Sequence, residues 1–339
     1  MSKAPDRRIV TPEEYEAARR ELAPKHVCFG NTGYSNICLR TESDKLAEMW
    51  KANYPKSQSS PWPSFIVEVF SKGENVRLYD KSRCRILMTG SDYYGCVKFG
   101  YRVLLADQML IRKNGVSMHS SALVIKDKTV VITGPSGAGK NTTMNYLDRK
   151  HNGLFLWDDW GVINPDGWIP IPNELSYHMS ETSAAALVPG FKPFLLETLE
   201  MYPRLCKQAG LICEPRTKPK YMVPLHLLRP TVANTITGGI VKTHSLVILT
   251  NDTDSTAVRK VDVEEALEIF SKPAWSWAWE CLVPFMNEHL MMNDTELAEL
   301  KEQYRTLFKN IPNLIIANNN KMEPDKQKFL EDVEKLVEE

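Results

Sequence analysis

The sequence predicts an α/β fold, with a mixed sheet at its centre, an antiparallel β region before it and helices after it. Three observations predict this arrangement. Residues 129–150 read as a strand, a glycine-rich loop and a helix. Residues 117–133 read as a β-hairpin that leads into that loop. Residues 65–99 contain short apolar runs separated by turn residues, which is typical of an antiparallel meander.

The composition is that of an ordinary globular protein. The chain has 339 residues, of which 43% are hydrophobic and 25% are charged, enough for one large or two modest domains. The formal net charge is zero, so we expect neither a nucleic-acid nor a membrane partner. Strand-sized apolar runs, a polar N-terminus and seven widely spaced cysteines favour a cytoplasmic protein without a disulfide framework.

The pattern divides the chain into three predicted regions. Residues 1–100 form an N-terminal α+β region with an antiparallel sheet, residues 101–272 form the core, and residues 273–339 form a C-terminal helical region. The predicted helices cover 11–22, 44–53, 101–112, 141–150, 193–202, 262–271, 275–289, 294–309 and 324–339. The predicted strands cover 26–41, 65–70, 75–79, 84–88, 93–99, 117–125, 129–133, 154–157, 160–163, 168–171, 221–228, 243–250 and 313–317.

The glycine-rich loop has the G-x-x-x-x-G-K form of a phosphate-binding loop, from Gly134 to Lys140. Glycines let backbone N–H groups curl around phosphate oxygens, and the following helix adds its positive N-terminal end. Lys140 supplies a point charge for the outer phosphates. The predicted nucleotide-binding residues are Gly134, Pro135, Ser136, Gly137, Ala138, Gly139, Lys140, Asn141 and Thr142.

Asn141 departs from this pattern, because a Ser or Thr hydroxyl normally follows the lysine and holds Mg²⁺. Three interpretations stay open. The amide oxygen of Asn141 serves as an altered metal ligand, or Thr142 takes over after a small shift. In the third, metal-nucleotide affinity is reduced and the protein is a weak or inactive enzyme. An engineered substitution is a further alternative.

Two acidic residues, Asp158 and Asp159, end an apolar strand shortly after the loop. An acid at such a position suits a metal ligand or a general base. Neighbouring side chains on a strand point to opposite faces, so one carboxylate can reach the reaction while the other is anchored. His119, on the first strand of the hairpin, either packs in the core or orients one of the aspartates.

These stretches together resemble a known family. The sequences MHSSALVI (118–125), ITGPSGAGKN (132–141) and LFLWDDW (154–160) look like the kinase core of the HPr kinase/phosphorylase-like proteins, whose fold is similar to that of phosphoenolpyruvate carboxykinases. The specific resemblance covers about 101–160. It implies that one of Asp158 and Asp159 is the general base on the acceptor hydroxyl, that the other engages Mg²⁺, and that His119 supports the base. We assign Asp158 as the base and Asp159 as the metal ligand, together with Asn141, which departs from the Ser or Thr of the family. Lys140 joins Asp158 and His119 as the catalytic set.

The function expected from the resemblance and the loop is an ATP-dependent kinase that uses Mg²⁺, with GTP as the alternative nucleotide. It would transfer the γ-phosphoryl group to a hydroxyl of a small molecule or of a peptide or protein serine. The alternative is a catalytically weak or inactive nucleotide-binding sensor or scaffold. A carboxykinase-like decarboxylating enzyme is a third interpretation, and a homo-oligomer is left open.

Overall fold

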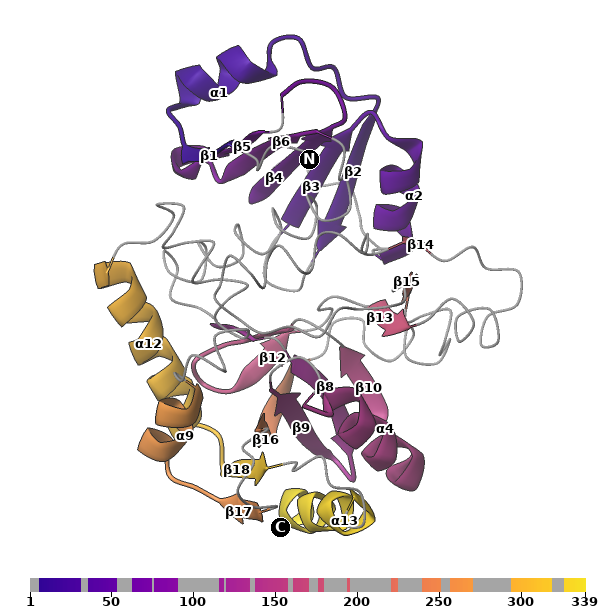
Figure 1. Ribbon diagram of the computed structural model, residues 1–339, viewed down its shortest axis with the longest axis vertical. Helices are drawn as coiled ribbons and strands as arrows, with labels where there is room; N and C mark the ends of the chain where they lie inside the picture. Colours follow the sequence, from indigo (N-terminus) through magenta and orange to yellow (C-terminus); the bar gives the residue numbers. More distant parts are fainter. Residues whose placement is uncertain are drawn as a thin grey trace. The chain divides into compact units, whose positions relative to one another are not determined.

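The computed structural model of the chain divides into two compact units (Figure 1). Unit 1 comprises Met1–Gln108, Leu175–Pro230 and Leu282–Asn293, and unit 2 comprises Met109–Glu174, Thr231–Cys281 and Asp294–Glu339. The domain boundaries expected after residues 100 and 272 stay a prediction. The structure describes residues 6–31, 36–53, 63–74, 76–90, 116–118, 120–134, 138–157, 161–170, 176–179, 194–195, 221–224, 240–250, 257–270, 294–318 and 326–339.

Unit 1 contains a six-stranded sheet with the strand order β1-β5-β6-β4-β3-β2. Its strands are β1 (Asp6–Ile9), β2 (His26–Asn31), β3 (Asn36–Thr41), β4 (Phe65–Phe70), β5 (Val76–Asp80) and β6 (Arg85–Thr89). The helices α1 (Pro12–Arg19) and α2 (Asp44–Asn53) accompany this sheet, and both lie where the sequence predicts a helix.

This sheet is mixed, so the antiparallel sheet expected in the N-terminal region is wrong. The pairs β1–β5, β3–β4 and β4–β6 are parallel, whereas β2–β3 and β5–β6 are antiparallel. The physical reason lies in two features. Helix α2 connects β3 to β4 as a crossover, which makes neighbouring strands parallel. The five residues of β6 are all buried, which is typical of strands that are covered on both faces.

Helix α1 is attached to this sheet through a buried carboxylate. Thr11 and Glu14 form a capping box that starts the helix. The Tyr15 hydroxyl donates to Glu68 Oε2 at 2.8 Å, and Arg19 Nε donates to Glu68 Oε1 at 2.6 Å. The Glu68 side chain in β4 is fully buried, so its charge requires these partners.

A three-stranded sheet also falls within unit 1. Its order is β13-β15-β14, with β13 (Ser176–Met179), β14 (Phe194–Leu195) and β15 (Tyr221–Pro224). Strand β14 lies inside the helix predicted over 193–202, so that prediction is wrong at these two residues. Pairing with β15 decides their conformation, because tertiary contacts override a weak local helix preference.

Unit 2 is built on a seven-stranded mixed sheet with the order β10-β8-β9-β16-β18-β17, and β12 pairs with β16 beside this path. The mixed sheet predicted for the core is therefore confirmed. Its strands are β8 (Ser120–Ile125), β9 (Lys128–Thr133), β10 (Leu154–Trp157), β12 (Trp168–Pro170), β16 (Ile240–Thr250), β17 (Ala257–Lys260) and β18 (Asn313–Asn318). A separate two-stranded ladder joins β7 (Val116–Met118) to β11 (Gly161–Ile163).

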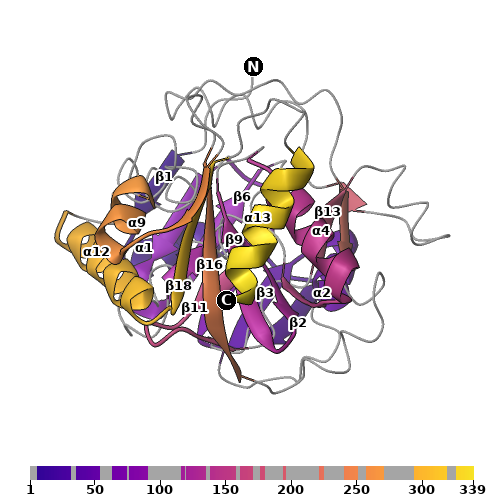
Figure 2. The same cartoon turned by 90° about the horizontal axis from the view of Figure 1, so that it is seen from below.

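Helices cover both faces of the sheet in unit 2. Helices α4 (Lys140–His151) and α13 (Lys326–Glu338) lie on one face, and α9 (Val263–Phe270) and α12 (Asp294–Lys309) lie on the other (Figure 2). The α9–α12 layer is held by aromatic packing, with the Phe270 and Tyr304 ring centroids 5.0 Å apart. Among the helices that the structure describes, none has the length and apolar character needed to cross a membrane.

The predicted hairpin before the glycine-rich loop is confirmed. Strands β8 and β9 are antiparallel, and Ile125 pairs with Lys128 next to the turn. The two turn residues, Lys126 and Asp127, have φ values of 46° and 63°. Left-handed residues at both central positions define the turn type that matches the twist of a two-residue hairpin. The hairpin thus fixes the direction in which β9 enters the loop.

Candidate functional site

The candidate site begins where β9 ends, at the edge of the unit 2 sheet. Strands β9 and β16 are parallel, with Thr133 paired to Ile248, and β18 runs parallel to β16. The carboxyl ends of these strands therefore meet at one edge. In sheets of this kind, ligands bind outside the carboxyl ends of the strands.

Gly134 occupies a position that only glycine fits without a shift of its neighbours. A Cβ atom built on Gly134 would lie 2.9 Å from Leu249 Cβ, 3.0 Å from the Leu249 carbonyl oxygen and 3.3 Å from Ala138 Cβ. The first two contacts come from the neighbouring strand β16, and the third comes from the far end of the loop. The first glycine of the motif therefore lets the loop fold back closely over the sheet edge.

The other end of the loop begins helix α4. Gly139 is the N-cap residue with a φ of 100°, a left-handed conformation that favours glycine, and the Thr143 N–H donates to its carbonyl at 2.9 Å. Among the described residues, no side chain caps this helix start. The first N–H groups of a helix have no partner within the helix. Such a terminus attracts anions, phosphate groups in particular.

Lys140 connects the two ends of the loop. Its Nζ donates to the Gly134 carbonyl oxygen at 2.7 Å, although the residue itself is the first of α4. Lys140 is 8% exposed, so its ammonium group is held beside the Gly134 carbonyl and not in bulk water. A positive charge held next to a helix N-terminus is suited to binding a polyphosphate.

The three residues after Lys140 differ in exposure. Asn141 is half-buried, Thr142 is exposed and Thr143 is 1% exposed. Within the described part of the chain, the buried Thr143 hydroxyl oxygen has no hydrogen-bond partner. The interpretations of Asn141 as the metal ligand, and of Thr142 as its replacement, stay predictions.

The remaining predicted site residues lie outside the described part of the chain. They are Pro135, Ser136, Gly137, His119, Asp158 and Asp159. The structure therefore brings together Gly134, Ala138, Gly139 and Lys140 from the predicted set, and the roles assigned to the other residues stay predictions.

The strands that flank His119 pair with the strands that flank Asp158 and Asp159. Strand β7 pairs with β11, and β8 pairs with β10. Met118 pairs with Gly161 in the β7–β11 ladder, and Ala122 pairs with Trp157 in the β8–β10 ladder. Strand β8 is antiparallel to both β9 and β10, so the carboxyl ends of β9 and β10 lie at the same edge of the sheet. The chain enters residues 158–160 from the edge at which Gly134 lies.

The loop contact with Leu249 was not predicted from the sequence. Strand β16 is predicted over 243–250, but which strand lies beside β9 is set by the long-range pairing of β9 and β16. The glycines of the motif indicate that another part of the chain passes close to the loop backbone, but they do not indicate which strand it is.

Comparisons with known proteins leave the chain without a family. No protein-family model matches the sequence, and no curated protein matches it. Among solved structures, the chain is similar to the HPr(Ser) kinase/phosphatase from Coxiella burnetii, with a TM-score of 0.26 and 10% sequence identity. The match covers 65% of this chain and 95% of that chain.

Proposed function

We propose that unit 2 is an ATP-dependent kinase, which transfers the γ-phosphoryl group to a hydroxyl of a small molecule or of a peptide or protein serine. The observation that carries the proposal is the position of Lys140. Its Nζ donates a hydrogen bond to the Gly134 carbonyl oxygen at 2.7 Å and so links the start of α4 to the end of β9. This arrangement places a charge, a glycine turn and a helix N-terminus around one small volume.

Two glycine positions support the proposal of a triphosphate ligand. The Gly134 position has no room for a side chain, and Gly139 adopts a left-handed conformation at the helix start. These are the two places where a phosphate-binding loop needs glycine. Lys140 and the first N–H groups of α4 would hold the phosphates, and Asp159 and Asn141 would hold Mg²⁺, which neutralises phosphate charge when bound.

The proposed reaction uses the chain's own residues mainly for positioning and charge. The acceptor oxygen attacks the γ-phosphorus, its proton passes to the Asp158 carboxylate, and the bond from the γ-phosphorus to the bridging oxygen breaks to release ADP. Lys140 stabilises the charge that develops on the phosphoryl oxygens. His119 holds Asp158 in the orientation needed to accept the proton.

A transfer assay tests the proposal. The wild-type protein with γ-labelled ATP, Mg²⁺ and a panel of hydroxyl metabolites and serine peptides should give a labelled product. Loss of the base in Asp158→Asn should lower the rate by about 10²–10⁴-fold while ATP binding remains. Asp166→Asn, in the exposed turn before β12, is the matched control and should keep full activity. Unchanged transfer in both Asp158→Asn and Asp159→Asn would overturn the mechanism.

A second candidate function follows from Asn141. An amide in place of the usual hydroxyl lengthens the arm that would reach Mg²⁺, and this favours a nucleotide-binding sensor or scaffold with little turnover. The test is Asn141→Ser in the same assay. A large gain in ATP turnover by this variant over a nearly inactive wild type would support the sensor. Measurable turnover that is the same in the variant and the wild type would support the kinase.

A further inference from the structure

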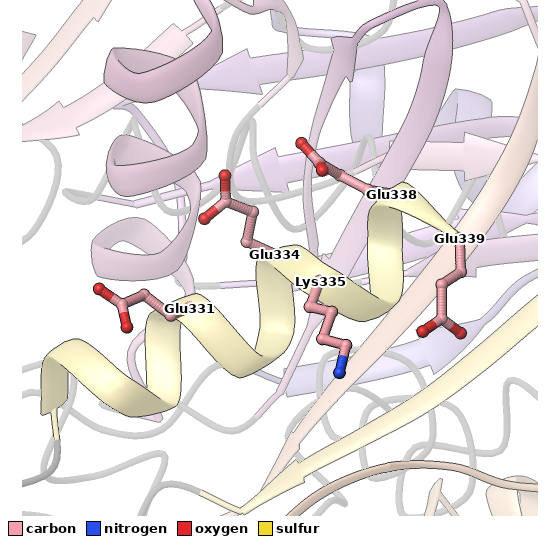
Figure 3. A pocket seen from close by; sticks show the side chains of 5 residues that line it. All are labelled: Glu331, Glu334, Lys335, Glu338 and Glu339. Carbon is pink, nitrogen blue, oxygen red and sulfur yellow. The ribbon is translucent and has the colours of Figure 1, made fainter.

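Three metal-ligating side chains meet where the C-terminal end of α4 packs against α13. His151 Nε2 lies 2.8 Å from Glu334 Oε1 and 3.4 Å from Glu338 Oε1. One potential ligand atom from each residue lies within 4.8 Å of the others. Figure 3 shows that Glu334 and Glu338 point to the same side of α13, whereas Lys335 and Glu339 point to the opposite side.

We propose that His151, Glu334 and Glu338 form a binding site for a divalent transition-metal ion, with Zn²⁺ as the preferred ion. An imidazole nitrogen combined with carboxylate oxygens is a ligand set that such ions accept. Metal–ligand bonds of about 2.0–2.2 Å require ligand atoms roughly 3.3 Å apart in a tetrahedral site. The 2.8 Å and 3.4 Å separations from His151 Nε2 lie on either side of this value, and all three ligand atoms lie within 4.8 Å of one another.

Neighbouring residues hold Glu334 in the orientation that such a site needs. The Tyr146 hydroxyl donates to Glu334 Oε2 at 2.9 Å, and Lys150 Nζ donates to the same oxygen at 2.5 Å. Oε1 therefore faces His151. Hydrogen-bond partners that orient a ligand are a regular part of metal sites.

Two lysines form ion pairs with the carboxylates of this site, Lys150 with Glu334 and Lys126 with Glu338, and the second pair competes with a metal ion for Glu338 Oε1. Lys126 Nζ lies 2.5 Å from Glu338 Oε1, and the Lys126 side chain is 60% exposed. An exposed lysine can swing into solvent, and pairs of this kind contribute little to stability. A shallow depression of about 430 Å³ along α13, lined by Glu334 and Glu338 among others, gives an ion access to the carboxylates.

The proposed metal site is separate from the nucleotide site. His151 ends α4 and Lys140 begins it, which places them roughly 16 Å apart along the axis at 1.5 Å per residue. The inference therefore does not depend on the proposed kinase activity. A bound ion would fasten α13 to the helix that follows the phosphate-binding loop.

Titration of the full-length protein with Zn²⁺ in the absence of nucleotide tests the proposal. We expect one ion per chain in the wild type, and at least tenfold weaker binding in His151→Ala and in Glu338→Gln. Glu331→Gln is the matched control, because Glu331 lies on the same helix and lines the same depression but is outside the cluster. Its affinity should equal that of the wild type.

Two further measurements make the result decisive. Mn²⁺, which suits carboxylate ligands better than thiolates, shows whether the ion binds here or at cysteines. The melting temperature should rise with Zn²⁺ in the wild type and in Glu331→Gln, but not in Glu338→Gln. Because the Glu338 side chain is partly exposed, we expect Glu338→Gln to fold even if His151→Ala does not. If the wild type shows no one-to-one site, or if His151→Ala and Glu338→Gln both bind Zn²⁺ as tightly as the wild type, the three side chains form ion pairs only.

Discussion

At the scale of single residues, Gly134 links the packing of the sheet to the shape of the loop. The neighbouring strand β16 passes so close that a Cβ atom at this position would lie 2.9 Å from Leu249 Cβ. The same residue accepts the hydrogen bond from Lys140 Nζ through its carbonyl. A change at Gly134 should therefore affect both the stability of unit 2 and the position of the lysine.

The first prediction concerns Gly134→Ala. The added methyl group should lower the free energy of unfolding by about 1–3 kcal/mol, because Leu249 and the backbone of β16 must move to make room. Urea denaturation measures the change. The exposed substitution Thr142→Ala is the control and should change stability by less than about 0.5 kcal/mol. An alanine variant as stable as the wild type would show that the loop and β16 are not packed as described.

The second prediction concerns the pH dependence of Cys38. Burial raises the pKa of this thiol to about 11, and the residue is 1% exposed. Because the thiolate is the reactive form, labelling should be very slow at pH 8 and should rise about tenfold per pH unit up to the pKa. Peptide mass spectrometry after alkylation of the native protein measures it. The half-buried Cys84 should be labelled faster, and equal labelling of both at pH 8 would contradict the burial of Cys38.

At the scale of secondary-structure elements, the hairpin of β8 and β9 delivers the chain into the loop through a turn that its sequence does not favour. Lys126 and Asp127 both adopt left-handed conformations, although neither is glycine. Left-handed backbone costs a residue with a Cβ atom roughly 1 kcal/mol. The hairpin therefore depends on cross-strand pairing and on the burial of β8 and β9.

The third prediction concerns this turn. Asp127→Gly should raise the free energy of unfolding by up to about 1 kcal/mol, because glycine adopts the φ of 63° without strain. Urea denaturation at constant pH measures it. Asp166→Gly is the matched control, since Asp166 lies in an exposed turn and has no left-handed φ. Equal or lower stability of Asp127→Gly would show that the side chain of Asp127 contributes more than its strain costs.

Much of the local structure could be predicted from the sequence, but several strand partners could not. The helix over Asp44–Asn53 and the hairpin of β8 and β9 follow from periodicity and turn composition. The parallel pairing of β4 with β6 was missed, because a run such as FIVEVF does not specify its neighbour. The cluster of His151 with Glu334 was missed as well, since the fold brings together residues 183 positions apart.

At the scale of the whole molecule, the two units are interleaved along the chain, because each contains three separate segments. The described part of the glycine-rich loop lies entirely in unit 2, with Gly134 and Lys140 in the first segment of that unit. A ligand at this loop should therefore stabilise the strands and helices of unit 2 directly.

The fourth prediction follows from this division. ATP with Mg²⁺ at 100 times its Kd should stabilise the site by about 2.7 kcal/mol through mass action. Hydrogen–deuterium exchange should slow in β9 and α4, and should slow less in β4 and β6 of unit 1. The same experiment with Lys140→Ala at the same ATP concentration is the control, in which the protection should be clearly smaller, because this variant should bind ATP more weakly. Protection confined to unit 1 would place the nucleotide elsewhere.

A calorimetric titration of the 339-residue chain with ATP and Mg²⁺ shows directly whether the glycine-rich loop binds a nucleotide. We expect one nucleotide per chain, at least tenfold weaker binding by Lys140→Ala, and unchanged binding by Arg149→Ala, an exposed residue on the same helix. Loss of the Lys140 ammonium group removes the charge held beside the Gly134 carbonyl, whereas Arg149 lies in the last turn of α4. Absence of binding in the wild type, or equal binding by Lys140→Ala, would contradict nucleotide binding at this loop.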